Sequence, residues 1–315
     1  MDPKRWELRA ARVTRAAPLR PPIGAALRCG FCMLALFILS MWGEASAGQA
    51  HEAEKDTEHL FGFTIGSGIG EKGEKELENE TNTLTGKNGG TYAAVFDQLE
   101  AKYTLAQSFR IAAAAVLAYH NINGIPDIGD LHRGAFQGGS VDARIRLLDL
   151  ERSAFGFTVS IEPHWNRTDD VTGQRVQNYR GTVRLALDKE IVARRLYAAV
   201  NVLYEPEVTH FLNAETWVRQ SLIGISGAIT MRVSSGLFIG SEVVYRRLYD
   251  GLGFDSLAGH ALSVGPTFYA KLSEHWWASL AWNVQVSGHA ADRPGALDLV
   301  NFERHRATLR FGYNF

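Results

Sequence analysis

Few side chains in this sequence are placed to act as a nucleophile and its base. A hydrolase needs a hydroxyl within hydrogen-bond reach of an imidazole. Ser160 shares an extended segment with His164, but it lies too far along that segment to reach the ring. Trp165 and Asn166 follow His164, so no nucleophile stands beside it. The other histidines near segment ends show no better arrangement, and we expect a protein that is not an enzyme; these are His120, His210 and His260.

No set of metal ligands or phosphate-binding loop stands out either. An acid-rich stretch could attract divalent cations, but five carboxylates in a run of glycine, lysine and asparagine are typical of a solvated loop; they are Glu71, Glu74, Glu76, Glu78 and Glu80. Cys29 and Cys32 form a C-x-x-C pair inside a segment that we expect to be removed. Glycines between Gly62 and Gly70 lie on a predicted strand and not at a strand–helix junction. We therefore expect no metal and no cofactor.

Charged side chains recur at alternate positions of apolar segments. Those predicted to line an interior are Arg144, Arg146, Arg180, Arg184, Arg306, Arg310, Glu162 and Glu242. The wider inward set adds Lys102, Arg219, Arg246, Lys271, Glu100, Asp142 and Glu205, so that basic residues outnumber acidic ones about two to one. Such a lining favours anions in an open pore. Arginine and glutamate that face each other could also form a salt-bridged plug.

The segments that carry these charges alternate with a period of two, which is typical of β-strands. We predict twelve strands, the first at 60–69 and the second at about 92–105, with 71–91 between them as a long exposed loop. Further long polar connections are expected at 121–139, 166–177, 205–214, 249–259 and 288–301, and short turns at the opposite ends of the strands. For the strand from Trp217 to about Val233, the sequence pattern gives the weakest indication of which side chains face outward and which face inward.

The last seven residues give the clearest indication of the environment in which the strands lie. Apolar or aromatic groups stand at every second position and the chain ends on Phe315, with Tyr313 and Phe311 before it. This ending resembles the C-terminal assembly signature of Gram-negative outer-membrane β-barrel proteins. The resemblance implies a closing strand with its apolar face toward lipid, and recognition by the barrel-assembly machinery. Long connections on one side only and an even strand number are typical of the same class.

The chain begins with a segment of a different kind. Seven basic residues precede a run of about a dozen apolar residues, Phe31 to Trp42, which is too short to span a bilayer as a helix. Ala45-Ser46-Ala47 follows as a small-residue cleavage site, so residues 1–47 read as a secretory signal peptide. We expect a periplasmic tail at 48–58, the barrel at 59–315, and no cysteine after cleavage. The aromatic residues near strand ends are expected to form two belts at the membrane interfaces.

Taken together, the sequence predicts an all-β, transmembrane, antiparallel up-and-down barrel of about twelve strands in the outer membrane. Its predicted function is passive diffusion of small solutes, with a lean toward anions, through a narrow arginine-lined lumen. A non-conducting barrel with a salt-bridged lumen and an outer-membrane lipid hydrolase are the alternatives. Expected partners are outer-membrane lipid and lipopolysaccharide, small solutes, and the assembly machinery through Phe311, Tyr313 and Phe315. A net charge of -1 gives no nucleic-acid footprint.

Overall fold

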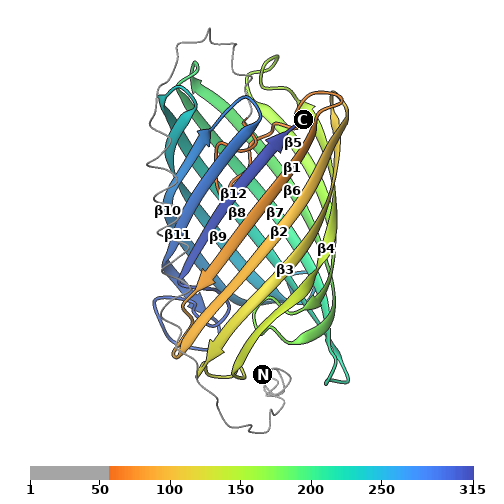
Figure 1. Cartoon of the computed structure of the whole chain (residues 1–315). Coiled ribbons are helices and arrows are strands. Elements are labelled where there is room, and N and C mark those ends of the chain that lie inside the picture. The colour runs from red at the N-terminus through yellow and green to blue at the C-terminus, as the bar shows by residue number, and fades with distance from the viewer. Residues whose placement is uncertain (1–56) are drawn as a thin grey trace, which may run out of the picture. The chain divides into compact units, whose positions relative to one another are not determined.

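Residues 57–315 are described by the computed structural model, and they form one closed antiparallel barrel of twelve strands (Figure 1). Each strand pairs with the next along the chain, and β1 pairs with β12 to close the ring. Within this range no helix is long and apolar enough to cross a membrane. The strands are β1 (Lys75–Thr85), β2 (Thr91–Ala106), β3 (Phe109–Asn123), β4 (Leu131–Leu148), β5 (Gly156–Thr168), β6 (Arg175–Val192), β7 (Leu196–Phe211), β8 (Trp217–Ser234), β9 (Leu237–Asp250), β10 (Ser256–Lys271), β11 (Trp276–Ala290) and β12 (His305–Asn314).

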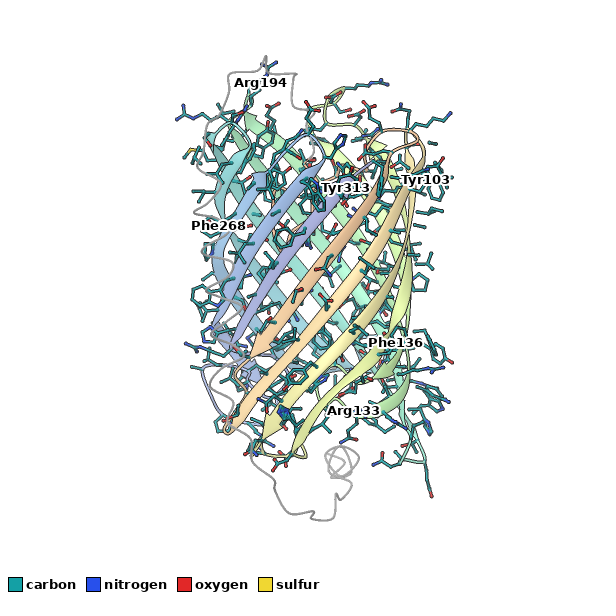
Figure 2. All side chains as sticks on the ribbon, in the orientation of Figure 1. Tyr103, Arg133, Phe136, Arg194, Phe268 and Tyr313 are labelled. Atoms are coloured by element: carbon teal, nitrogen blue, oxygen red, sulfur yellow. The ribbon has the colours of Figure 1, made fainter. Side chains whose placement is uncertain are left out.

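The period of two in the sequence sorts the side chains between the two faces of the wall. On β2, Leu99 and Tyr103 project outward and are 52% and 40% exposed, whereas Lys102 and Thr104 point inward and are buried. Phe136 and Phe268 project outward from β4 and β10 in the same way (Figure 2). The outer surface is therefore apolar and the interior polar, as the resemblance to outer-membrane barrels implies.

The first predicted strand, 60–69, is wrong. Residues 57–70 form an irregular segment, named here the N-terminal segment, that lies inside the barrel (Figure 1). The alternating glycines do not form the polar face of a strand. They allow the segment to pack closely against neighbouring atoms. A Cβ on Gly62 would lie 2.1 Å from the Cβ of Ala281, and one on Gly66 would lie 2.0 Å from the carbonyl oxygen of Thr57. Thr57 and Glu58 are buried there, so the last two residues of the predicted tail 48–58 belong to the barrel interior.

The membrane strand that replaces it, β1, lies within the predicted loop 71–91. Its outward positions are mostly polar, including Asn79 and Thr81, which donate hydrogen bonds to Asp97 on β2 at 3.0 and 2.8 Å. Its inward positions begin with Glu76, Glu78 and Glu80 and continue with Asn82 and Leu84. A strand without an apolar face gives no alternating hydrophobic pattern, so the sequence resembled a solvated loop. Pairing with β12 and β2 determines the strand.

A small apolar core lies inside the barrel, around the N-terminal segment. Leu60 and Phe61 pack with side chains from β7, β8, β10 and β11, among them Tyr197, Tyr269 and Trp277. Trp277 is 2% exposed and stacks on His59 at 3.7 Å between ring centroids. The expectation that aromatic residues near strand ends lie in interfacial belts is wrong for Trp277, because the odd positions of β11 from Trp277 to Gln285 face the interior.

The connections at the two ends differ less in length than the sequence predicted. The strands continue through polar stretches, which shortens the expected long loops to 86–90, 124–130, 169–174, 212–216 and 251–255; only 291–304 stays long. At the opposite end, named here the turn end, the connections are 107–108, 149–155, 193–195, 235–236 and 272–275. The C-terminus also lies at the turn end (Figure 1). Backbone pairing needs no apolar side chains, so strands extend beyond the part that the hydrophobic pattern marks.

Two predicted inward residues lie elsewhere. Arg219 on β8 is exposed, because the inward set on this strand consists of even positions such as Gln220 and Leu222. Lys271 is exposed at the last position of β10, at the turn end. The predicted signal peptide, with Cys29 and Cys32, lies outside the described residues.

The exchange of 60–69 for 75–85 as the first strand can be tested by cysteine labelling. Residues 48–315 hold no cysteine, so each variant refolded from this range carries a single thiol. In lipid vesicles, Leu77→Cys should react with a lipid-soluble maleimide, because Leu77 is 40% exposed on the outer face. Phe61→Cys should not react, because Phe61 is fully buried. Leu99→Cys serves as the lipid-facing control, and labelling of Phe61→Cys at its rate would contradict the assignment.

Candidate functional site

The interior of the barrel contains a cavity of about 440 Å³. The N-terminal segment borders it toward the turn end, with Gly62, Phe63 and Ile65 in its lining. At the other end, Asp170 of the β5–β6 connection and Phe302 of the β11–β12 connection reach into it. The cavity is thus covered from both sides by chain segments that are not strands of the wall.

Six of the eight residues predicted to line the interior border this cavity. They are Arg144, Arg180, Arg184, Arg306, Arg310 and Glu162. Arg146 instead lies by the turn end, where its guanidinium donates to the carbonyl oxygen of Gln107 at 2.5 Å. Glu242 points inward from β9 but binds the N-terminal segment.

The charge of the cavity differs from the predicted excess of arginine. Nine cationic side chains line it, namely Lys87, Lys102, Arg144, Arg180, Arg184, Arg246, Arg304, Arg306 and Arg310. Ten acidic side chains do so, namely Glu58, Glu78, Glu80, Glu100, Asp142, Glu162, Asp170, Glu205, Glu207 and Glu303. The sequence count missed Glu78 and Glu80, because β1 was taken for a loop, and Glu58, because the N-terminal segment was taken for a tail and a strand. The lining is therefore close to balanced.

Glu242 forms the first of three attachments of the N-terminal segment. Its carboxylate accepts hydrogen bonds from three consecutive backbone amides, those of Gly62, Phe63 and Thr64, at 2.5, 3.0 and 2.7 Å. Hydrogen bonds to an ionised acceptor are stronger than neutral ones. Since the segment has no strand partner, these bonds supply backbone pairing that a ladder would otherwise give.

Asn201 and Asp188 form the second attachment. The Asn201 amide accepts from the Ile65 nitrogen and donates to the Ile65 carbonyl, both at 2.8 Å, and so imitates a paired strand residue. The Asp188 carboxylate accepts from the Ser67 amide at 2.9 Å and from its hydroxyl at 2.6 Å. Thr158 donates to the Ser67 carbonyl at 2.6 Å. Lumen-facing polar residues of β5, β6 and β7 thus hold the segment along its length.

The third attachment is an ion cluster around Glu58. Its carboxylate accepts from both Nη atoms of Arg110, with one contact at 2.5 Å, and lies 2.8 Å from Nη1 of Arg144 and 3.5 Å from Nζ of Lys102. Burial by itself raises the pKa of Glu58, but Arg110, Lys102 and Arg144 together hold it well below the ordinary value. Glu58 is therefore ionised at neutral pH and locks the start of the segment to β2, β3 and β4.

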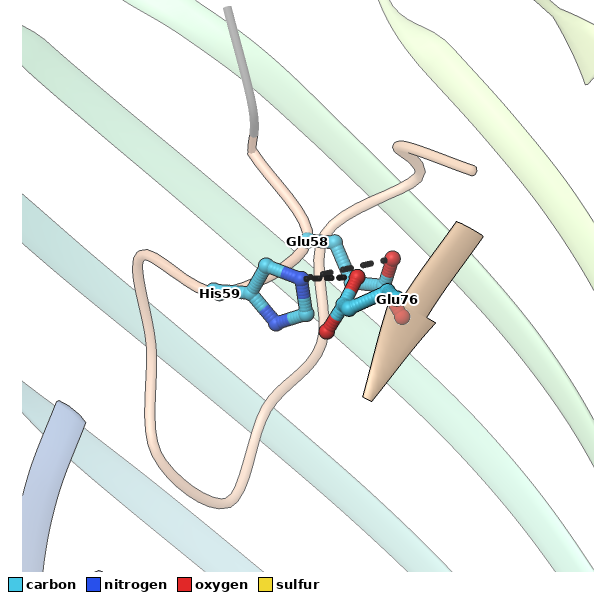
Figure 3. A group of neighbouring side chains, drawn as sticks. All are labelled: Glu58, His59 and Glu76. Carbon is cyan, nitrogen blue, oxygen red and sulfur yellow. Dashed lines mark hydrogen bonds and ion pairs between the residues drawn. The ribbon is translucent and has the colours of Figure 1, made fainter. Parts of the chain in front are cut away.

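Glu58, His59 and Glu76 lie close enough together to be considered as metal ligands (Figure 3). His59 Nε2 is 3.3 Å from Glu76 and 3.7 Å from Glu58. However, Lys102 lies 3.1 Å from Glu76, and Arg110 and Arg144 bind Glu58. A divalent cation would have to displace cations that already neutralise these carboxylates, so the group is an ion-paired anchor and the donor set does not favour a metal.

A second ion group lies at the loop end, the end opposite the turn end. Glu303, just before β12, is 2.6 Å from Arg246 and 3.0 Å from Arg306. Burial opposes ionisation of Glu303, but the two arginines lower its pKa far below the ordinary value. This group binds the β11–β12 connection to the wall, so two of the predicted pore arginines are engaged in structural ion pairs.

The histidines weighed as hydrolytic bases lie in different surroundings. His164 Nε2 is 3.2 Å from the Thr182 hydroxyl, but that hydroxyl donates to Glu205 at 3.0 Å, so its proton is not available to the imidazole. His120 is buried and contacts the Asp170 carbonyl at 3.1 Å. His210 packs near Trp217, and His260 near Tyr245 and His289. None of these arrangements resembles a nucleophile with its base.

The closed twelve-stranded barrel with an apolar outside and a polar inside defines an outer-membrane β-barrel protein. Among solved structures, the COG4313 outer membrane channel from Pseudomonas putida F1 matches with a TM-score of 0.55 at 12% identity, over 78% of this chain and 96% of that one. The β domain of the Bordetella autotransporter Brka matches with a TM-score of 0.51 at 10% identity, over 78% and 100%. At these identities the likeness establishes the fold alone.

The chain belongs to a family of unknown function, DUF6662, whose model matches residues 53–315. The match covers all of the described barrel and its N-terminal segment. A search of the curated proteins found no matching sequence.

Attachment of the N-terminal segment should depend on pH through Glu58. Because its folded-state pKa is lowered, its contribution is complete above the unfolded value near 4.5 and is lost as the pH falls through the folded value. Hydrogen exchange of the amides of residues 62–67, corrected for the intrinsic pH effect, should therefore accelerate at acid pH. Glu58→Gln removes the carboxylate that pairs with the buried Arg110 and should weaken attachment by about 3 kcal/mol at neutral pH, with a flatter profile. Identical profiles for the two proteins would contradict this role.

Proposed function

We propose that this protein is a narrow outer-membrane channel for small polar solutes, closed at its periplasmic end by its own N-terminal segment. The observation that carries the proposal is a cavity lined by charged side chains inside a closed barrel. The N-terminal segment covers this cavity, and hydrogen bonds to side chains hold it there in place of strand pairing. The segment is attached through side chains, so it can leave while every wall strand keeps its partners. The fold shared with the Pseudomonas putida channel supports the same reading.

The orientation follows from the class of fold. Outer-membrane barrels place short turns and both termini in the periplasm. The turn end, with the C-terminus and the N-terminal segment, is then periplasmic, and the connection 291–304 faces the exterior. Export would require residues 1–47 as a signal peptide. The outward-facing Phe311 and Tyr313 and the exposed Phe315 would be available to the assembly machinery, and outer-membrane lipid and lipopolysaccharide would contact the apolar outside.

The predicted preference for anions loses its main support in the balanced lining. An excess of one sign would have raised the local concentration of the opposite ion. With ten acids against nine cations, we propose weak selectivity and a lumen suited to solutes of low net charge.

A non-conducting structural barrel is the second candidate, and a specific observation favours it. The Glu58 cluster and the Glu303 group hold chain segments across both ends of the lumen through buried ion pairs. If these groups never open, the interior is a plug. A lipid hydrolase finds less support, because the candidate histidines have no activated hydroxyl beside them.

Opening of the channel should depend on Glu242. In planar bilayers we expect small, infrequent current steps from the wild-type protein. Glu242→Ala removes three charge-assisted hydrogen bonds, each worth about 1.5–3 kcal/mol, and should give larger and more frequent steps. Glu162→Ala is the matched control, since Glu162 is an acid of the cavity lining whose hydrogen-bond and ion-pair partners are Ser140 and His164, outside the N-terminal segment. A folded Glu242→Ala barrel without current would refute the channel and favour the structural barrel.

Charge reversal at Arg184 tests whether ions pass through this cavity. Arg184 lines the cavity and makes no ion pair within residues 57–315, so Arg184→Glu changes the local charge without breaking an ion pair. Under a salt gradient, the reversal potential should move toward cation preference. Arg219→Glu, on the exposed outer side of β8, should leave it unchanged. Equal potentials for wild type and Arg184→Glu would place the ion path elsewhere.

A further inference from the structure

One side of the lumen combines apolar side chains with two opposite charges that do not meet. Two neighbouring rows of inward-facing residues cross β6 to β9 here. The first row is Arg184, Leu203 and Gly224, which are consecutive cross-strand partners. The second row is Glu205, Leu222 and Leu248, which are partners in the same way. Gly224 is buried, and the other five residues are half-buried. All six line the cavity.

The apolar part of this surface is continuous. A Cβ on Gly224 would lie 2.8 Å from Cγ of Leu203, so the leucine side chain lies over the glycine. Leu222 lies two residues before Gly224 and faces the same side, directly opposite Leu248. Phe63 of the N-terminal segment borders the same cavity. Apolar surface exposed to water is unfavourable. Passage of hydrated ions or sugars alone therefore does not explain leucines at these positions.

Arg184 and Glu205 are available to a ligand. They are diagonal neighbours on β6 and β7, a relation that places Cβ atoms roughly 7–8 Å apart. Both side chains are long enough to form an ion pair, yet neither has one among residues 57–315. Arg184 also makes no side-chain hydrogen bond there, and Glu205 accepts one, from Thr182 at 3.0 Å. By contrast, Arg180, Arg246, Arg306 and Arg310 are each paired with a carboxylate.

The neighbouring acid, Glu207, is engaged differently. It accepts hydrogen bonds from Asn178 at 2.5 Å, Thr209 at 2.9 Å and Gln220 at 3.2 Å, which occupy both carboxylate oxygens. It therefore has less capacity for a further donor, although it lines the same cavity. This difference distinguishes Glu205 as the acid that a ligand would meet.

We infer that this surface binds an amphipathic zwitterion, with a carboxylate on Arg184, an ammonium group on Glu205 and an apolar side chain against Leu203, Leu222 and Leu248. A free apolar amino acid or a short apolar peptide has this chemistry. The guanidinium fork suits a carboxylate, and the free oxygen of Glu205 suits an ammonium donor. The inference rests on the proposed channel, in which this site would select the solute that passes.

Isothermal titration of the full chain in detergent micelles tests the site without requiring conduction. L-leucine is the probe, isocaproate lacks its ammonium group, isoamylamine lacks its carboxylate, and glycine lacks its side chain. We expect leucine to bind and each of the other three to bind at least tenfold more weakly, because each forfeits one charge-assisted or apolar contact. Absence of leucine binding, or equal binding of any of the three, would overturn the inference.

Variants assign the contacts. Arg184→Gln and Glu205→Gln should each weaken leucine binding at least tenfold, while isoamylamine binding is unchanged by the first and isocaproate binding by the second. Arg304→Gln and Glu207→Gln are matched controls and should stay within about twofold of wild type. Arg304 is an arginine of the same cavity that has no ion pair within residues 57–315, and Glu207 is an acid whose oxygens already accept hydrogen bonds. Far-ultraviolet circular dichroism and heat-modifiable electrophoretic mobility verify that each variant is folded. Unchanged leucine binding in a folded Arg184→Gln or Glu205→Gln protein would overturn the inference.

The outcomes separate the two proposals. Conductance without leucine binding would keep the channel and overturn this site. Leucine binding by a protein that passes no current, even as Glu242→Ala, would keep the site and refute the channel.

Discussion

A backbone that crosses lipid must pair its N–H and C=O groups within the protein, because hydrocarbon offers no other donors or acceptors. Pairing of β1 with β12 meets this condition by closing the sheet. Once the wall is closed, alternation along each strand sends one set of side chains to lipid and the other into a shared interior. The composition of that interior, its ion pairs and its cavity all follow from closure.

The interior is filled by chain as well as by side chains. The N-terminal segment brings apolar groups such as Phe61 onto Trp277 and its neighbours, and brings Glu58 to a group of buried cations. Without Glu58, the cations Arg110 and Arg144 would lie buried with fewer counter-charges, which is costly. The ion pairs that neutralise the buried arginines of the wall therefore also hold the N-terminal segment in the lumen. The stability of the barrel interior thus depends on the segment that covers the cavity.

Side-chain attachment gives this segment a different character from a strand of the wall. Glu242, Asn201 and Asp188 provide the acceptors and donors that a neighbouring strand would provide. A strand cannot leave the barrel without exposing a ladder on both sides, whereas departure of this segment breaks its side-chain hydrogen bonds, ion pairs and apolar contacts and leaves every strand ladder paired. Movement of the segment is thus compatible with an intact barrel, and the surface of Leu203, Leu222 and Leu248 lies in the part of the lumen that such movement would open.

The sequence by itself determined the class of fold, the strand number and the facing of most strands, because lipid imposes an alternation that is legible residue by residue, as in Leu99 and Lys102. Six of the residues that it predicted to line a pore border the cavity, while their role in conduction stays a prediction; they are Arg144, Arg180, Arg184, Arg306, Arg310 and Glu162. Only the tertiary structure decided that 60–69 lies inside and 75–85 in the wall, since 60–69 alternates like a strand, 75–85 has no apolar face, and the choice depends on partners far away in the chain. Whether Arg310 or Arg184 is paired was equally undetermined, because a pair such as Arg310 with Glu80 joins strands whose contact exists only after the barrel closes.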